Sequence, residues 1–163
     1  SSNISYWYCW KIFWCTINNG GHMIPIVITG HGQFATSIKE TIKYILGEQP
    51  NVYFVDFNNG MGNRELEDKL KNLIQELNSK QILFLTDLVG GTPFSTAVLL
   101  SEENPEYKVF GGCNMPMIIS AIELSEEEDI NYIADEILNF AKDNIILFNP
   151  IITNTSTDDE DGI

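Results

Sequence analysis

Basic residues, cysteines and long apolar runs are all scarce in this sequence of 163 residues. Nine Lys and Arg residues stand against 23 Asp and Glu residues, which gives a formal net charge of −14. This balance argues against binding to nucleic acid or anionic membranes, because both attract clustered Lys and Arg. Three cysteines are too few for a disulfide framework and favour a cytoplasmic location. No apolar run approaches the roughly 20 residues of a membrane helix.

The composition divides the chain into three segments. Residues 1–22 hold all three tryptophans and two of the three cysteines, but only one charge, Lys11. The run Gly21-His22-Met23 is typical of a cloning junction followed by a natural start, so residues 1–22 are expected to be a tag, a linker or a non-native extension. A native aromatic extension or a short disulfide loop is the alternative. Residues 23–152 form the predicted domain, and the polar, acidic residues 153–163 a flexible tail.

Short β-branched runs alternate with helical apolar patterns along the domain. The predicted strands are Ile24–Thr29, Val52–Phe57, Ile82–Thr86 and Tyr107–Phe110. Helices are expected between the strands, and two follow the fourth strand, one opened by Asn114 and one by a capping box of Ser125 and Glu128. Such alternation predicts an α/β fold, with a doubly wound, mainly parallel sheet of order 2-1-3-4 and helices on both faces.

Two polar residues stand at the carboxyl ends of the first and third predicted strands. His31 is the only histidine of the predicted domain and lies between Gly30 and Gly32, while Asp87 ends an apolar strand. Doubly wound sheets bind ligands where the strand order reverses, which is between these two strands. A carboxylate that holds one ring nitrogen fixes the tautomer of an imidazole and leaves the other nitrogen free to attack. His31 and Asp87 are therefore the predicted catalytic pair.

A glycine-rich loop, residues 88–93 (LVGGTP), follows Asp87. Successive amides around paired glycines form anion-binding nests. Thr92 offers a hydroxyl that either caps the next helix, with the proline at its first position, or binds a phosphate oxygen. Amides at the start of the helix after His31 could also receive an anion. The predicted phosphate-binding residues are Gly32, Gly90, Gly91 and Thr92.

One pattern favours a different class of protein. Residues 30–35 match G-x-G-x-x-A after a first strand, and Asp56 ends the second strand, as in a dinucleotide-binding domain. Against this alternative, residues 23–152 leave little room for a substrate domain, and a bulky histidine occupies the tight turn. Metal binding is not indicated, because one histidine and Cys113 give no ligand spacing. Neither a metal nor a cofactor is expected.

Four segments of the domain resemble a known family. They are IVITGHG at 26–32, LGE at 46–48, FLTDLVGGTPF at 84–94 and GCNMPM at 112–117. Together they resemble the IIA component of mannose-family sugar phosphotransferase systems. The resemblance implies a cytoplasmic phosphocarrier that accepts a phosphoryl group from phospho-HPr on His31 and passes it to a IIB component. It implies further that Asp87 orients the ring and that Thr92 supplies the hydroxyl of the glycine loop.

The resemblance also implies an assembly and leaves some questions open. It implies a homodimer that exchanges a C-terminal antiparallel strand, for which Ile145–Phe148 is the candidate, and an indirect association with the membrane components IIC and IID. Residues 88–89 are Leu-Val where mannose-type members often have Thr-Trp, so fructose, sorbose or N-acetylgalactosamine is as plausible a sugar. The alternatives are the phosphoryl-donor subunit of dihydroxyacetone kinase and a regulatory phospho-acceptor module.

Overall fold

The computed structural model describes residues 22–151. The expectations for the extension and the acidic tail fall on residues 1–21 and 152–163, which lie outside the described residues. Within residues 22–151, no helix is both long and apolar enough to cross a bilayer.

A four-stranded parallel sheet of order β2-β1-β3-β4 forms the centre of the domain, as the sequence predicts. Its strands are β1 (Ile26–His31), β2 (Val52–Phe57), β3 (Ile82–Thr86) and β4 (Tyr107–Phe110). The first strand runs from Ile26 to His31 rather than from Ile24 to Thr29, because its pairing with β2 begins with Ile26 opposite Val52 and continues as far as His31 opposite Phe57. The histidine is thus the last residue of a strand.

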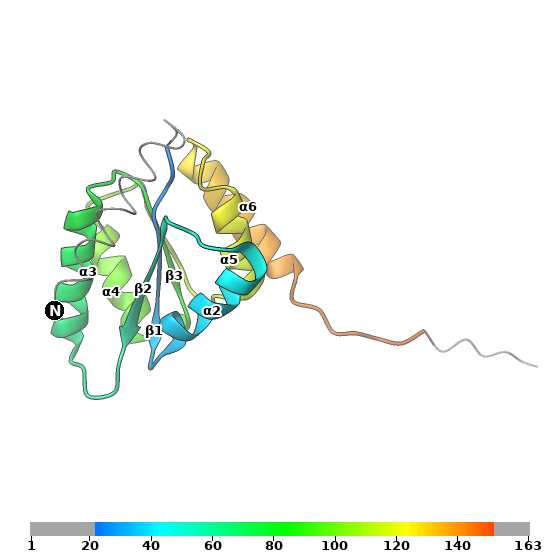
Figure 1. Ribbon diagram of the computed structural model, residues 1–163, viewed down its shortest axis with the longest axis horizontal. Helices are drawn as coiled ribbons and strands as arrows, with labels where there is room; N and C mark the ends of the chain where they lie inside the picture. The colour runs from blue at the N-terminus through cyan, green and yellow to red at the C-terminus, as the bar shows by residue number, and fades with distance from the viewer. Residues whose placement is uncertain (1–21, 152–163) are drawn as a thin grey trace, which may run out of the picture.

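Helices cover both faces of this sheet (Figure 1). They are α2 (Phe34–Leu46), α3 (Asn63–Leu77), α4 (Thr92–Ser101), α5 (Met115–Glu123) and α6 (Ile130–Asp143). Helices α3 and α4 pack on one face, and α2, α5 and α6 pack on the other. The doubly wound arrangement predicted from the alternating pattern is therefore confirmed.

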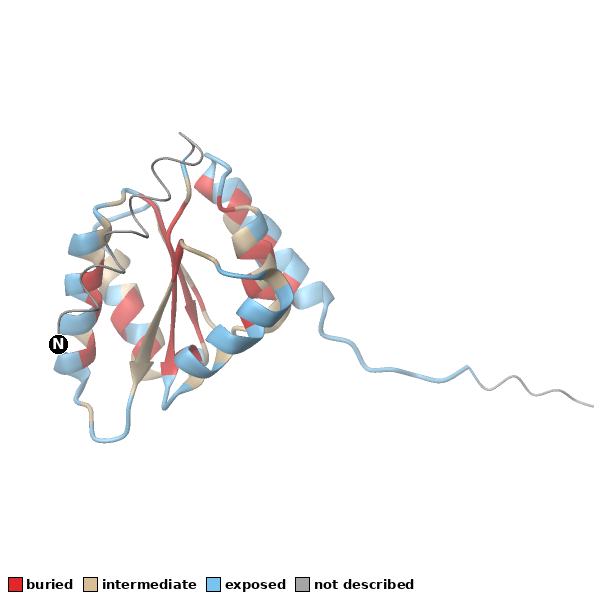
Figure 2. Ribbon diagram, in the orientation of Figure 1, coloured by how far each residue is buried: buried red, intermediate tan, exposed pale blue. Residues whose placement is uncertain are grey.

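The two central strands are buried on both faces, so their sequences are apolar almost throughout (Figure 2). In β1, Ile26 and Ile28 face the core beside α5 and α6, whereas Val27 faces α3 and α4. All residues of β1 are buried except the last, His31, which is exposed. His31 is therefore the one exposed residue of β1, and it lies at the carboxyl edge of the sheet.

Helix caps show where side-chain patterns predict local structure and where they do not. Asn114 caps α5 as predicted, because its side chain accepts a hydrogen bond from the backbone N–H three residues later. The capping box of Ser125 and Glu128 is wrong: Asp129 caps α6, and the hydroxyl of the buried Ser125 donates instead to a carbonyl at the end of α5.

Ile145–Phe148 forms no strand in the single chain. The segment leaves the end of α6 and runs away from the domain (Figure 1), and its four side chains are 73–84% exposed. The exchange of this segment across a dimer stays a prediction.

Candidate functional site

The structure brings His31 and Asp87 into direct contact at the carboxyl edge of the sheet. They end or follow the neighbouring strands β1 and β3, whose last paired residues are Thr29 and Thr86. The ring Nδ1 of His31 lies 2.8 Å from Oδ2 of Asp87, and the backbone N–H of His31 donates to the same oxygen at 2.9 Å. Because a carboxylate accepts hydrogen bonds, this contact assigns the proton to Nδ1 and leaves the lone pair on Nε2.

The free side of the imidazole lies against the start of α4. A Cβ atom built on Gly91 would come within 2.6 Å of Cε1 and 3.3 Å of Nε2 of His31. Gly91 is the N-cap of α4, so Nε2 stands at the positive end of that helix dipole. The side chain of His31 is 45% exposed, against 15% for Asp87. The imidazole is thus partly accessible to solvent, while the carboxylate behind it is largely shielded from water.

Gly30 has a steric role in the same contact. A Cβ on Gly30 would meet Cγ of Asp87 at 2.9 Å and Cδ1 of Phe34 at 2.5 Å. Only a residue without a side chain lets the carboxylate lie so close to the end of β1. The sequence places Gly30 beside His31 but does not by itself predict this contact, although an isolated glycine in an apolar strand often marks a close approach.

The four predicted phosphate-binding residues fall into two groups. Gly32 has φ +58° and donates its amide to the carbonyl of Phe57 at 2.7 Å, so this amide already has an acceptor. Gly90 (φ +79°), Gly91 and Thr92 form the turn into α4. One of the two roles expected of Thr92, capping the helix, is wrong, because Gly91 occupies the N-cap position and no side chain caps the helix there. The first amides of a helix lack partners within it, so the start of α4 offers donors near Nε2.

Asp56 caps α2 from the neighbouring strand. Its Oδ1 accepts the backbone N–H of Thr36 at 3.0 Å, and its Oδ2 accepts the Thr36 hydroxyl at 2.6 Å. Both carboxylate oxygens therefore bind within the protein. Asp56 is therefore engaged with Thr36, which argues against the dinucleotide-binding alternative, in which Asp56 would bind a ribose.

Cys113 lies beside the predicted catalytic pair, on the loop between β4 and α5. Its backbone N–H donates to the carbonyl of Thr86 at 2.9 Å, next to Asp87. Burial, and secondly the charge of Asp87, raises the pKa of the Cys113 thiol to about 12. The thiol therefore stays neutral at physiological pH. Across residues 22–151, no group of three or more His, Cys, Asp or Glu residues is placed to hold a metal ion.

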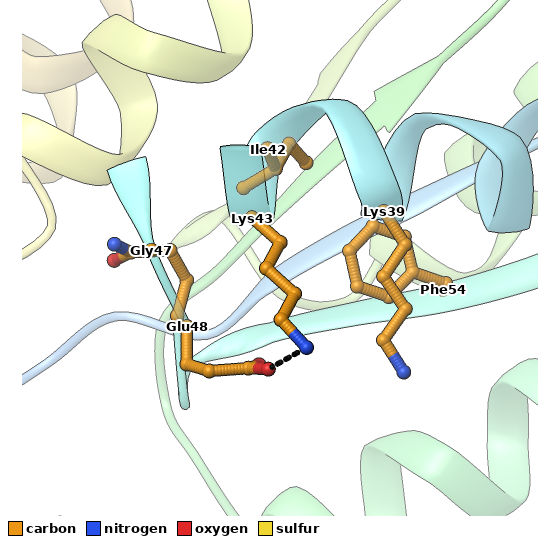
Figure 3. A pocket seen from close by; sticks show the side chains of 7 residues that line it. Lys39, Ile42, Lys43, Gly47, Glu48 and Phe54 are labelled. Carbon is orange, nitrogen blue, oxygen red and sulfur yellow. Dashed lines mark ion pairs between the residues drawn. The ribbon is translucent and has the colours of Figure 1, made fainter. Parts of the chain in front are cut away.

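A hollow elsewhere on the described surface lies between α2 and β2, away from His31. The side chains of Lys39, Lys43, Glu48 and Phe54 line it (Figure 3). Lys43 and Glu48 form an exposed ion pair at 3.0 Å, and the ammonium of Lys39 lies 6.0 Å from the ring centre of Phe54. This lining contains neither residue of the predicted catalytic pair, which lies at the carboxyl edge of the sheet.

These features define a doubly wound α/β protein with an imidazole held by a carboxylate at the point where its strand order reverses. Residues 25–138 match the family model EIIA-man, described as the PTS system fructose IIA component. The chain belongs to this family, the IIA components of the mannose family of sugar phosphotransferase systems. Components of this family are phosphotransferases in the general sense.

Individual relatives agree with this assignment. The fructose-specific EIIA component of Bacillus subtilis is 32% identical over 64% of this chain and 72% of its own length. The mannose-specific EIIAB component of Escherichia coli is 34% identical over 72% of this chain, but the match spans only 36% of that longer protein. The crystal structure of a phosphotransferase system EIIA component from Streptococcus agalactiae superposes with a TM-score of 0.69 at 32% identity, covering 76% of this chain and 96% of that one.

Proposed function

We propose that this chain is a phosphocarrier of a sugar phosphotransferase system. It accepts a phosphoryl group from phospho-HPr on Nε2 of His31 and passes it to a IIB component during sugar uptake. The observation that carries the proposal is the 2.8 Å contact between Nδ1 of His31 and Asp87, which leaves the lone pair on Nε2 of a half-exposed ring. Family membership supports HPr and IIB as the kind of donor and acceptor.

The proposed transfer is an in-line displacement at phosphorus. The lone pair on Nε2 of His31 forms the new N–P bond, while the N–P bond to the donor imidazole breaks and its electron pair returns to that ring. The proton on Nδ1 stays in its hydrogen bond to Asp87, whose negative charge stabilises the positive charge that develops on the ring. The reverse sequence, with the IIB component as acceptor, removes the phosphoryl group again.

The transferred group would lie at the N-terminus of α4. Gly90, Gly91 and Thr92 lead into this helix beside Nε2. The backbone amides of Gly90 and Thr92, the Thr92 hydroxyl and the helix dipole together stabilise the phosphoryl oxygens, while the amide of Gly91 donates to the carbonyl of Leu88 at 3.3 Å and this residue contributes its lack of a side chain. The amide of Gly32 is not available to the phosphoryl group, because it donates to the carbonyl of Phe57. Gly32 instead provides the left-handed turn that follows His31. The scheme needs neither a metal nor a cofactor.

The proposal extends to location and assembly. The carrier acts in the cytoplasm as a homodimer, reaches the membrane components IIC and IID through IIB, and has no role in nucleic-acid binding. Relatives named for fructose, mannose and sorbose match at 26–34% identity, so the proposal covers the sugars of the family rather than one of them.

Phosphoryl transfer from phosphoenolpyruvate tests this function directly. The chain is incubated with the general carriers, including HPr, and labelled phosphoenolpyruvate, and the adduct is mapped by its acid-labile, base-stable character. We expect His31→Ala to abolish labelling with an unchanged circular dichroism spectrum, and His22→Ala, at the other described histidine, to label normally. Residual label in His31→Ala would place the acceptor elsewhere. Discharge by a dihydroxyacetone kinase subunit but not by a IIB component would favour the kinase alternative.

A further inference from the structure

Phe57 contacts the catalytic histidine from the neighbouring strand. His31 and Phe57 are the last paired residues of β1 and β2, directly opposite each other in the parallel register. Their ring centres lie 5.8 Å apart with an interplanar angle of 69°, an edge-to-face arrangement. Such arrangements are favoured by the quadrupoles of the two rings. The contact is therefore specific in geometry as well as apolar.

The imidazole needs such a contact because Asp87 fixes it at one atom only. The hydrogen bond at Nδ1 opposes a half-turn of the half-exposed ring about χ2, which would exchange Nδ1 with Cδ2 and Nε2 with Cε1 and would break this one bond. Gly91 limits this motion at the Cε1–Nε2 edge. Phe57 supplies a second wall, and its carbonyl also holds Gly32, the residue that follows the histidine, at 2.7 Å.

We infer that Phe57 is a positioning residue for phosphoryl transfer, which holds the His31 ring so that Nε2 faces the start of α4. The inference rests on the proposed function, because it assigns Phe57 a role in the same site. Phe57 also packs against the core beside α3 and α4, but its effect on transfer is assigned to its contact with the imidazole. Its removal should therefore change the ring orientation of His31 and the transfer rate together.

Three variants separate this role from a contribution to folding. Phe57→Leu removes the aromatic ring, and Phe57→Tyr keeps it. Phe54→Leu is the matched control, because it is the same exchange on the same strand, at a ring that lies beside Lys39 instead of His31 (Figure 3). For each protein we would record the ring nitrogen signals of His31 by NMR, the melting temperature, and the rate of phosphorylation by phosphoramidate, a small donor that needs no protein docking.

We expect Phe57→Leu to give exchange-broadened or mixed-tautomer ring signals and a roughly two- to tenfold slower rate, the factor that corresponds to one aromatic pair. Phe57→Tyr should restore both, and Phe54→Leu should lower the melting temperature without changing either. Wild-type ring signals in Phe57→Leu, or equal changes in Phe54→Leu, would overturn the inference.

If Phe57→Leu does not fold, the inference can still be tested by a measurement on the wild-type protein. Nuclear Overhauser effects between the ring protons of His31 and Phe57 are expected, and their absence would also overturn the inference. If the proposed function fails, the result is different. No donor then phosphorylates the wild-type protein, but the ring signals of His31 are still normal in the wild type and still change in Phe57→Leu.

Discussion

One carboxylate oxygen of Asp87, Oδ2, accepts hydrogen bonds from both the backbone N–H and the ring Nδ1–H of His31. The end of strand β1 and the imidazole are thus fixed by the same atom. The other oxygen, Oδ1, is buried and has no hydrogen-bond partner among the described residues. Within residues 22–151, the hydrogen bonds to this carboxylate thus converge on the oxygen that faces the ring.

The first prediction concerns Asp87→Asn. The substitution removes the negative charge, and an amide NH2 turned toward the ring would favour the tautomer with its proton on Nε2, which blocks the nucleophile. We expect labelling from phospho-HPr to slow by on the order of 10²- to 10⁴-fold, as for the loss of an orienting aspartate elsewhere. The measurement is the initial rate of labelling of Asp87→Asn and of the wild type, both at a temperature at which both proteins are folded. Transfer at the wild-type rate would remove the orienting role.

The meeting of His31 and Asp87 could be predicted from sequence because it depends only on topology. Parallel strands place their carboxyl ends at one edge, and the strand order follows from the alternating pattern. The contacts of Gly91 and Phe57 with the ring could not be predicted in this way. The first depends on the path of the loop into α4, and the second on the register that sets His31 opposite Phe57.

A second prediction tests the space that Gly91 leaves for the ring. Gly91→Ala would place a Cβ 2.6 Å from Cε1 of His31, so the imidazole must move away from the start of α4. Gly62→Ala is a matched control, because Gly62 is also a helix N-cap with similar backbone angles, and its Cβ would meet no atom within 4 Å.

Both substitutions cost the same small loss of N-cap preference, so the two variants should melt at similar temperatures. We expect phosphorylation of Gly91→Ala to fall about tenfold or more, because a misplacement of about 1 Å at a reacting group is costly. Gly62→Ala should react at the wild-type rate. Equal rates in the two variants would show that the ring tolerates the added methyl group.

The third prediction is a pH dependence caused by Cys113. Burial raises the pKa of this thiol to about 12 from an ordinary value near 9.0, so the folded state keeps a proton that the unfolded state releases between these values. The contribution of Cys113 to stability is therefore fully present below pH 9 and is lost as the pH rises toward 12, by at most about 1.4 kcal/mol for each pH unit. Urea unfolding of wild type and Cys113→Ala between pH 7 and 10.5 measures the difference. Parallel curves for the two proteins would contradict it.

The last prediction concerns the apolar segment Ile145–Phe148. Its four side chains are 73–84% exposed in the single chain, and large exposed apolar runs mark interaction sites. Fully burying one such side chain is worth roughly 1.5–3 kcal/mol, so together they could offset much of the cost of association, roughly 4–15 kcal/mol. We therefore expect a dimer whose melting temperature rises with protein concentration.

Replacing Ile146 and Phe148 together by Lys should yield a monomer by sedimentation equilibrium. Tyr44→Lys, at a side chain that is 92% exposed on α2, should leave the dimer intact. A wild-type protein that sediments as a monomer, or a double variant that stays dimeric, would show that this segment does not join two subunits.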